Sequence, residues 1–369
     1  MELINFLSKP SEFSRRTGPN DKIVLSSRVR LARNIRGFAF PGFAKKAERV
    51  RAFEVLRPAI EATAAMADHF AGSMDTLDAL DKQILVERHL ISREHAAKGP
   101  GSGIVFNHQE VLCVMINEED HLRMQAIFPG LQLKQAYAAI DALDSELEGR
   151  LDYAVSKDLG YLTACPTNLG TGIRVSAMLH LPGLVLAEQI NPIIQSVNKL
   201  GLAVRGLYGE GTEALGNIFQ VSNQMTLGES EADIVARLDK VLAQIIEHEE
   251  NGRQSLLEKK PKVLFNHIGR AYGILSNAYS ISSKETMNLL SLLRLGHDLG
   301  FLPGVERALV DELSIVTQPA HLRKKFSDEL QPEERDLLRA DMLRERLASV
   351  PRPQCRARGG DASLDKPQE

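Results

Sequence analysis

The chain lacks several features that would place it in a common protein class. Its 369 residues include no tryptophan, and the formal net charge is only −3. No apolar run approaches the ~18 residues of a membrane-spanning helix, and the N-terminus lacks the basic and apolar segments of a signal peptide. A pI near 6.4 gives no basic field for nucleic acid. We therefore expect a cytoplasmic protein that binds neither membrane nor nucleic acid directly.

Cysteines and the common nucleotide-binding motifs are equally scarce. Cys113, Cys165 and Cys355 stand in three different contexts, so their spacing indicates neither a disulfide framework nor a zinc site. No Gly-Lys dipeptide occurs, which excludes a P-loop, and the His-Arg-Asp and Asp-Phe-Gly signatures of protein kinases are absent. If the chain binds ATP, it does so by another arrangement.

The length and the changes of pattern along the chain predict two domains with tails. We expect an α+β domain with an antiparallel sheet flanked by helices, and after it an all-helical C-terminal domain. The predicted boundaries are a leader at 1–20, the α+β domain at 21–254, the helical domain at 255–348 and a disordered tail at 349–369.

Hydrophobic periodicity predicts the elements of the first domain. The expected strands are 23–34, 85–89, 103–107, 111–116, 161–165, 173–181, 202–208 and 218–221, with helices at 45–70, 186–200 and 231–249.

A charged cluster at residues 117–123, Asn-Glu-Glu-Asp-His-Leu-Arg, follows directly after the apolar run 111–116. The end of a buried strand is a usual place for functional side chains, because the scaffold fixes their position. A solvated turn is the alternative interpretation of a single cluster of this kind.

Arginines recur beside small residues at several predicted strand ends, namely Arg28, Arg30, Arg123, Arg174 and Arg205. Arg28 and Arg30 are two apart, so both point to one side of an extended strand. A planar guanidinium matches phosphate oxygens in a bidentate way, and several together could hold a triphosphate. Taken singly, each arginine would be interpreted first as an ordinary surface charge, and only the five together favour a binding site.

Four motifs occur in an order that resembles the guanidino (phosphagen) kinases, the family of creatine and arginine kinase. They are Ser-Ser-Arg-Val-Arg-Leu-Ala-Arg at 26–33, the cluster at 117–123, Cys-Pro-Thr-Asn-Leu-Gly-Thr-Gly at 165–172 and Arg-Gly-Leu-Tyr-Gly-Glu at 205–210. The resemblance covers about residues 21–254. It implies ATP as phosphoryl donor with Mg²⁺ held through the nucleotide, so no protein metal site is expected.

The chain differs from the metabolite kinases of that family in two features, and in both it resembles one branch, the bacterial protein-arginine kinases. Only 25 residues precede Ser26, where the metabolite kinases carry a helical domain that covers a small guanidino substrate, and here the helical domain follows instead. The segment 335–340, Arg-Asp-Leu-Leu-Arg-Ala, is similar to that branch's motif for allosteric phosphoarginine binding. The resemblance thus implies an enzyme that phosphorylates arginine side chains in proteins. Without it, 335–340 would be read as a solvated helix face.

The resemblance also implies roles for individual residues. Glu119 matches the catalytic base, Glu210 the second substrate-binding glutamate and Cys165 the reactive cysteine, although Cys165 could instead be a small structural residue before Pro166. Glu118 is the adjacent alternative to Glu119. The implied ATP-binding residues are Ser26, Ser27, Arg28, Val29, Arg30, His89, Arg123, Arg174, Val175, Ser176, Ala177, Met178, Arg205, Gly206, Leu207, Tyr208 and Gly209. The implied phosphoarginine-binding residues are Arg335, Asp336, Arg339 and Ala340.

Partners follow from the same resemblance. Protein substrates with exposed arginines, a zinc-binding activator, an unfoldase-protease, a heat-shock repressor and a homodimer are expected, with phosphorylation marking proteins for regulated degradation and controlling the stress-response repressor. Two alternatives stay open at this point. The chain could phosphorylate free arginine or another small guanidine, or it could be a catalytically idle adaptor that binds phosphoarginine through Arg335 and Arg339.

Overall fold

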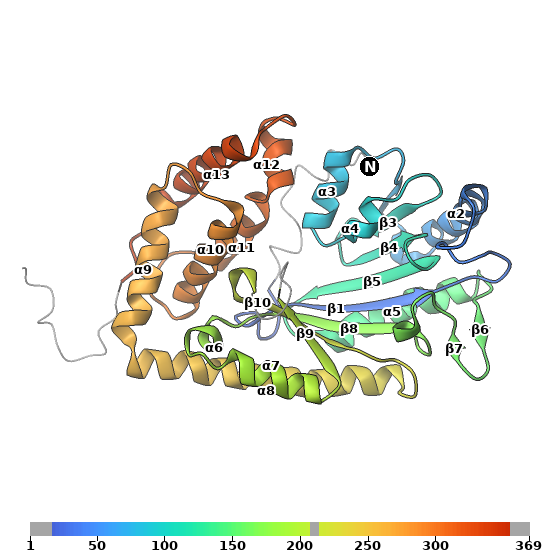
Figure 1. The fold of residues 1–369 in the computed structure, drawn as a ribbon, viewed down its shortest axis with the longest axis horizontal. Helices are drawn as coiled ribbons and strands as arrows, with labels where there is room; N and C mark the ends of the chain where they lie inside the picture. Colours follow the sequence, from blue (N-terminus) through green and yellow to red (C-terminus); the bar gives the residue numbers. More distant parts are fainter. Residues whose placement is uncertain (1–16, 207–213, 355–369) are drawn as a thin grey trace, which may run out of the picture.

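One antiparallel sheet forms the centre of the computed structural model, which describes residues 17–206 and 214–354 (Figure 1). The prediction of an α+β fold followed by helices is confirmed. All neighbouring strands of the sheet run antiparallel. Across the sheet the order is β2 (His69–Ser73), β3 (Gly103–Asn107), β4 (Leu112–Ile116), β5 (Leu122–Pro129), β1 (Val24–Arg33), β8 (Ile173–His180), β10 (Ile218–Asn223) and β9 (Leu202–Gly206).

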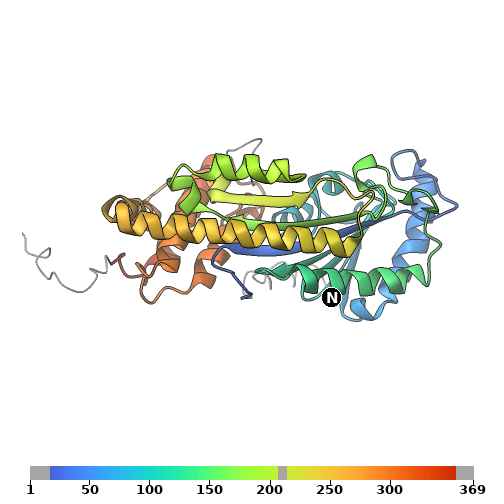
Figure 2. The same cartoon turned by 90° about the horizontal axis from the view of Figure 1, so that it is seen from below.

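Helices cover one face of this sheet. Val29 and Leu31 of β1 point to that face and are buried in the main core, because successive side chains of a strand alternate between its two sides. Figure 2 shows α5 (Leu133–Glu148) and α8 (Glu231–Lys259) running along the sheet. The shorter helices α6 (Pro182–Leu186) and α7 (Ile190–Lys199) lie beside α8 and β9. On the opposite face, α3 (Ala79–Glu87) packs against β3 and β4.

The long helix α8 leads into the C-terminal helices. Ser230 caps its N-terminus by accepting a hydrogen bond from the Asp233 amide, and the predicted apolar stripe from Ile234 to Ile245 is buried. The helix runs without a break past residue 254, where the sequence predicts the domain boundary. Beyond it lie α9 (Pro261–Asn277), α10 (Ser283–Asp298), α11 (Arg307–Val316), α12 (Pro319–Phe326) and α13 (Pro332–Leu347).

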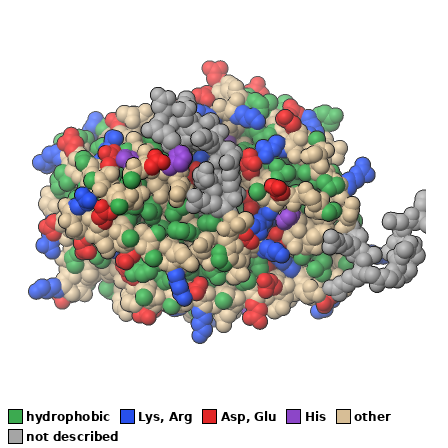
Figure 3. Space-filling view, turned by 180° about the vertical axis from the view of Figure 1, so that it is seen from behind, with side chains coloured by type: hydrophobic (Ala, Val, Ile, Leu, Met, Phe, Trp, Pro, Cys, Tyr) green, Lys and Arg blue, Asp and Glu red, His purple; other side chains and the backbone are tan. Residues whose placement is uncertain are grey.

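The C-terminal helices have a core of their own, which includes Leu275, Leu293, Leu313 and Leu343. Val350 is buried against it, and beyond Gln354 the predicted tail lies outside the described residues. Of the helices that the structure describes, none has the length and apolarity needed to span a bilayer. On the face in Figure 3 acidic and basic side chains are interspersed, which agrees with the small net charge.

Buried ion pairs join the helical part to the sheet. Arg253 of α8 lies 2.6 Å from the Glu249 carboxylate and 3.2 Å from that of Asp298. Arg294 of α10 pairs with Asp311 at 2.8 Å and also donates to the Asp21 carbonyl at the start of β1. These contacts fix the end of the strand that carries Arg28 and Arg30.

Three predicted elements are wrong. Residues 85–89 are not a strand: α3 (Ala79–Glu87) is capped by Asp78 and buries Leu80 and Ile84, whose spacing of four suits a helix. The helix predicted at 45–70 ends early as α2 (Lys46–Glu61), and β2 follows it.

The third error is the strand predicted at 161–165. Only β7 (Gly160–Tyr161) forms, paired with β6 (Val155–Ser156), because Pro166 begins a 3₁₀ turn directly after Cys165. In addition, the helix predicted at 186–200 is split into α6 and α7 at Glu188, whose φ is +59°.

Candidate active site

Five predicted arginines meet on the face of the sheet that α5 and α8 leave uncovered. Arg28 and Arg30 project from β1, and Arg30 pairs directly with Arg174 of β8. Arg123 reaches the same face from β5, and Arg205 from β9, because the antiparallel register puts cross-strand partners on one side. Residues far apart in the sequence therefore form one cationic surface, the arginine face.

The charges on the arginine face are poorly neutralised. Burial, together with the positive charges of Arg123 and Arg174, lowers the pKa of Arg28 to about 10. The pKa of Arg30 is also held well below its usual value, first by burial and then by the neighbouring arginines. Among the described residues, Glu118 supplies the one carboxylate ion-paired with a member of the group, at 2.6 Å from Arg123. Such a cluster is suited to bind a multiply charged anion.

Neutral side chains of β10 hold two of these arginines. The Gln220 carboxamide oxygen accepts a hydrogen bond from Arg28 at 3.0 Å, and the Ser222 hydroxyl accepts one from Arg174 at 3.1 Å. These contacts orient the guanidinium groups without cancelling their charge. Sequence analysis missed both residues, because Gln220 lies in the predicted strand 218–221 without any further signal and Ser222 lies just beyond the predicted end of that strand.

The two adjacent glutamates in the turn between β4 and β5 have different environments. Burial by itself would raise the pKa of Glu118, but Arg123 and the Ser92 hydroxyl outweigh it and hold that pKa below its usual value. Glu119 is exposed, and its pKa is raised by partial burial and by the charges of Asp120 and Glu118. Glu118 is thus committed to Arg123, whereas Glu119 is accessible and has a raised proton affinity, as suits a base.

The third acid of the cluster, Asp120, anchors the cysteine segment. Its carboxylate accepts hydrogen bonds from the Asn34 amide at 2.6 Å and from the Ala164 backbone N–H at 2.7 Å. Cys165 follows at once, with its Sγ 3.0 Å from the Thr167 hydroxyl. Asp120 therefore ties Glu119 and Cys165 to one rigid frame. This link was not foreseen from the sequence.

Glycine is required where the segment after Cys165 meets β1. Gly172 has a φ of +67°, and a Cβ there would lie 2.6 Å from the Ala32 carbonyl oxygen. The close approach lets Gly172 accept a hydrogen bond from the Ala32 amide at 2.9 Å. Arg174 thereby starts β8 directly beside Arg30.

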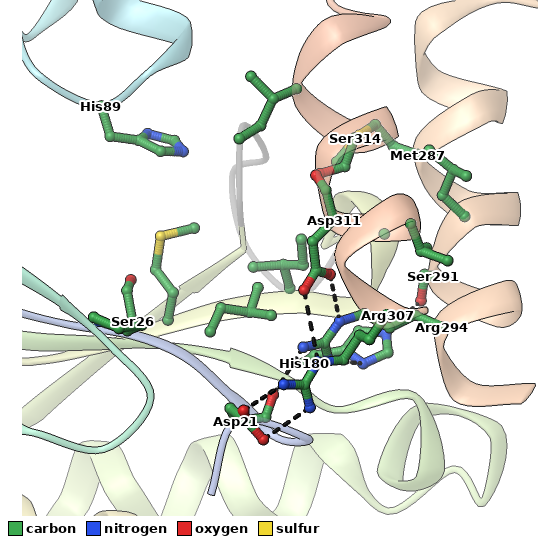
Figure 4. Close-up of a pocket in the computed structure, with 18 of the residues that line it drawn as sticks. Asp21, Ser26, His89, His180, Met287, Ser291, Arg294, Arg307, Asp311 and Ser314 are labelled. Carbon is green, nitrogen blue, oxygen red and sulfur yellow. Dashed lines mark hydrogen bonds and ion pairs between the residues drawn. The ribbon is translucent and has the colours of Figure 1, made fainter. Parts of the chain in front are cut away.

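A further group of predicted residues lies toward the N-terminal end of β1. Ser26 pairs with Met178 across the strands, and His89 stands over them from the turn after α3 (Figure 4). His89 has a φ of +61°, and burial together with the charge of Arg28 lowers its pKa to about 4. The imidazole is therefore neutral at physiological pH.

Other predicted ATP-binding side chains point away from the arginine face. Ser27 is fully buried on the helix-covered side, where its hydroxyl donates to the Gly130 carbonyl at 2.8 Å and accepts from the Gln132 amide at 2.9 Å. The same alternation directs Val29, Val175 and Ala177 into the core, while Ser176 lies on the side of Arg28. Any contact of these four inward residues with a nucleotide would have to come from their backbone.

Part of the predicted site lies outside the described residues, namely Leu207, Tyr208, Gly209 and Glu210; Gly206 ends β9. Within the ranges 17–206 and 214–354, no group of three or more histidines, cysteines or acids gathers as a metal site.

The segment 335–340 lies on α13, away from the arginine face. Arg339 is only 1% exposed; it donates to the Thr317 carbonyl at 2.9 Å and the Ile281 carbonyl at 2.8 Å, and it pairs with Asp336. Ala340 is buried in the helical core. Arg335 is half-buried, and in the described part of the chain its guanidinium makes no hydrogen bond or ion pair. The two arginines therefore differ, since Arg339 is bound within the fold and Arg335 is available.

Comparison with known proteins agrees with this geometry. The family model of the ATP:guanido phosphotransferase C-terminal catalytic domain matches residues 57–252, and that of the protein-arginine kinase McsB C-terminal domain matches residues 261–358. The chain is 48% identical over 346 residues to a protein-arginine kinase of Geobacillus stearothermophilus, covering 93% of this chain and 95% of the relative. It is 46% identical over 333 residues to one of Halothermothrix orenii, covering 89% and 94% respectively.

Solved structures of metabolite kinases share the fold of the catalytic part. A crystal structure of lombricine kinase matches with a TM-score of 0.55 and 25% identity, over 67% of this chain and 71% of that one. The substrate-free duplicated taurocyamine kinase from Schistosoma mansoni gives a TM-score of 0.57 and 25% identity, over 74% of this chain and 41% of the other.

Proposed function

The chain belongs to the ATP:guanido phosphotransferase family and, within it, to the protein-arginine kinases; on this premise we propose how its residues transfer the γ-phosphoryl group of ATP to arginine side chains. One observation carries the proposal. In the described part of the chain, the five arginines of the arginine face have one ion-paired carboxylate, that of Glu118 with Arg123, and the exposed Glu119 lies next to it in the chain. Such a cationic face can bind a triphosphate, and the carboxylate of such a glutamate can accept hydrogen bonds from the guanidinium of a substrate arginine.

In this proposal Arg28, Arg30, Arg123 and Arg174 hold the phosphates and stabilise the charge that spreads over the transferred group. Arg205 reaches the same face from the edge strand. Because cationic side chains line the site, Mg²⁺ would be held by phosphate oxygens of the nucleotide, where it neutralises charge on the phosphates.

Glu119 orients the acceptor arginine and takes its proton. A free guanidinium is protonated and therefore a poor nucleophile, so a carboxylate must fix one nitrogen in line with the γ-phosphorus and accept a proton as the N–P bond forms and the bond to ADP breaks. The raised pKa of Glu119 favours that transfer. Cys165, tied to the same frame through Asp120, would add negative charge near the guanidinium. Glu210 remains the proposed second carboxylate.

The activity is tested by phosphoryl transfer from γ-labelled ATP to a casein-like protein and, in parallel, to free arginine. We expect acid-labile, alkali-stable label on the protein, and Glu119→Ala to reduce kcat by about 10²-fold or more. The matched control is Glu94→Ala, which removes a nearby exposed carboxylate and keeps near wild-type activity. Label on free arginine alone would contradict the protein substrate, and full activity of Glu119→Ala would contradict the base.

Regulation by phosphoarginine on α13 is part of the same proposal. Arg335 is the group free to meet a phosphoryl oxygen, while Arg339 fixes the surrounding backbone. Arg335→Ala should therefore blunt activation by added phosphoarginine and keep basal activity, whereas Arg344→Ala on the same helix should behave as wild type. Undiminished activation of Arg335→Ala would refute the assignment.

Wider roles rest on the family resemblance. We infer that the modification marks proteins for an unfoldase-protease and controls a heat-shock repressor, with a zinc-binding activator and a second copy of this chain as partners. Pull-down of each purified partner with the phosphorylated and unphosphorylated chain tests this wider role.

A further inference from the structure

A deep pocket lies between the arginine face and the helical part of the chain. Its empty volume is about 1140 Å³, including space open to solvent, which is the size of a small-ligand site. Ser26, His89 and Met178 line it from the sheet side, and Ile315 and Gln318 line it from α11 and the turn after it. Figure 4 shows Ser26 and His89 on one side of this pocket and Met287, Asp311 and Ser314 on the other.

The pocket continues the arginine face in the direction of a nucleoside. Ser26 is two residues from Arg28 along β1, about 7 Å at the usual strand rise. A triphosphate held by Arg28 and Arg30 would therefore direct its ribose and base past Ser26 and Met178 into this space. Charged side chains such as Arg294 and Asp311 lie at its edge, but most of the surface that faces the pocket is apolar, with Ile218 from the sheet and Val310 from α11 among its contributors. Apolar walls suit the faces of a flat heterocycle, whose polar edge still needs a partner.

Gln318 supplies a hydrogen-bonding group on the helical wall. Its side-chain N–H donates to the Ser314 carbonyl at 2.9 Å and to the Met287 sulfur at 3.2 Å. Its carboxamide oxygen accepts no hydrogen bond from the residues described. The free group that Gln318 offers is therefore an acceptor. An acceptor matches the 6-amino group of adenine and opposes the 6-oxo group of guanine, which is itself an acceptor.

The backbone on both sides of Gln318 is fixed. Arg339 donates to the Thr317 carbonyl at 2.9 Å. The Glu87 carboxylate at the end of α3 accepts hydrogen bonds from the Ala320 and His321 amides at 2.8 and 3.2 Å. Groups held in this way lose little freedom when a ligand binds, so the wall is preorganised.

We infer that the helical domain completes the nucleotide site, with Ile315 covering the base and Gln318 selecting adenine over guanine. This inference rests on the proposed function, in which the arginine face binds the phosphates. The helical domain would then contribute residues to ATP binding and also carry the proposed regulatory site.

Two variants of the full chain test the inference. Ile315→Trp fills the pocket and should raise the KM for ATP about tenfold while kcat stays within about twofold. Gln318→Leu removes the acceptor and should lower the ATP over GTP preference in kcat/KM by about threefold to tenfold, as expected for one hydrogen bond. The matched control is Ala308→Trp, which adds the same side chain to an exposed position of α11 outside the pocket.

A measurement on the unmodified chain adds an independent test. ATP should slow hydrogen exchange in residues 310–318, and phosphate alone should not. Circular dichroism and thermal melting show whether each variant is folded. If a variant is not folded, the hydrogen-exchange result on the unmodified chain tests the inference instead.

Failure of the inference and failure of the proposed function give different results. If the wild type does not bind ATP, or if Arg30→Met binds it equally well, the proposed function is wrong. If ATP binding depends on Arg30 but Ile315→Trp and Gln318→Leu match Ala308→Trp, and residues 310–318 gain no protection, the helical wall has no role and the inference is overturned.

Discussion

Two groups of arginines in this molecule differ in what surrounds them. At the junction of sheet and helices, Arg253 and Arg294 lie within ion-pair distance of Glu249, Asp298 and Asp311. On the arginine face, a larger group has Glu118 as its one ion-pair partner among the described residues. Burying a charge is costly unless it is paired, so the first group belongs to the fold and the second leaves a net charge for a ligand.

The same difference occurs within one strand. Arg33 of β1 is 1% exposed and pairs with Asp144 of α5 at 2.6 Å, with the Tyr161 ring 3.5 Å from its guanidinium carbon. Arg30, three residues earlier, points to the other face and makes no ion pair with any residue in the ranges 17–206 and 214–354. The alternation of a strand thus assigns one arginine to structure and the other to the site.

Arg30→Met should have the largest effect. We expect kcat/KM for ATP to fall roughly 10²- to 10³-fold, because one preorganised cationic contact to the transferred phosphoryl group is lost. Without nucleotide, the free energy of unfolding should stay the same or rise, since the change relieves burial of a charge among like charges. Steady-state kinetics and urea denaturation measure the two. A large decrease in the free energy of unfolding would show that Arg30 stabilises the fold as Arg253 does, which would contradict the distinction between the two groups of arginines.

Arg253→Met should show the opposite pattern. Removing this guanidinium takes the nearest cation away from two buried carboxylates, Glu249 and Asp298, and we expect a loss of about 3–5 kcal/mol in the free energy of unfolding. The folded Arg253→Met variant should keep the wild-type KM for ATP, because Arg253 does not reach the arginine face. Urea denaturation at pH 7 gives the stability. If the substitution weakens ATP binding by more free energy than it takes from folding, the ion pairs at the junction of sheet and helices also support ATP binding, and the contrast between the two groups is wrong.

The smallest expected effect is that of Arg28→Met on the titration of His89. Burial and the charge of Arg28 lower the pKa of His89 to about 4, whereas burial, without Arg28, lowers that of His121 to about 4. The variant should therefore raise the pKa of His89 and leave that of His121 unchanged, as NMR titration of the two rings would show. An equal response of both histidines would contradict the assigned cause.

The same substitution affects stability in a defined pH window. A histidine whose pKa is lower in the folded chain makes folding less favourable as pH falls from about 6.5 toward about 4, because the unfolded chain takes up the proton first. Arg28→Met should reduce that loss by less than about 1.4 kcal/mol, the equivalent of one pKa unit. Stability measured between pH 7 and 4 provides the check.

Much of the site could be predicted because its residues lie in short ordered motifs. Arg28 and Arg30 are placed on one side by strand periodicity alone, and Glu119 is placed by the turn after a buried strand. Asp120, Gln220 and Gln318 could not be found in this way. Their partners are up to 192 residues away in the sequence, as for Arg28 and Gln220, and only the folded register brings them together.

The strand predicted at 85–89 failed for a related reason. A short apolar run fits a buried strand and a helical turn equally well, and packing of α3 against the neighbouring elements decided for the helix. His89 then lies in a left-handed turn over Ser26, a position that a strand would not have given it.

The sequence by itself determined the family, the antiparallel α+β class, the helical C-terminal part and most of the charged residues of the site, because these depend on local patterns. The tertiary structure decided which of those charges are neutralised. Strand pairing and the docking of the helices set every distance between a guanidinium and a carboxylate, so Arg33 and Arg253 stabilise the fold while Arg28 and Arg30 remain free to bind a phosphate.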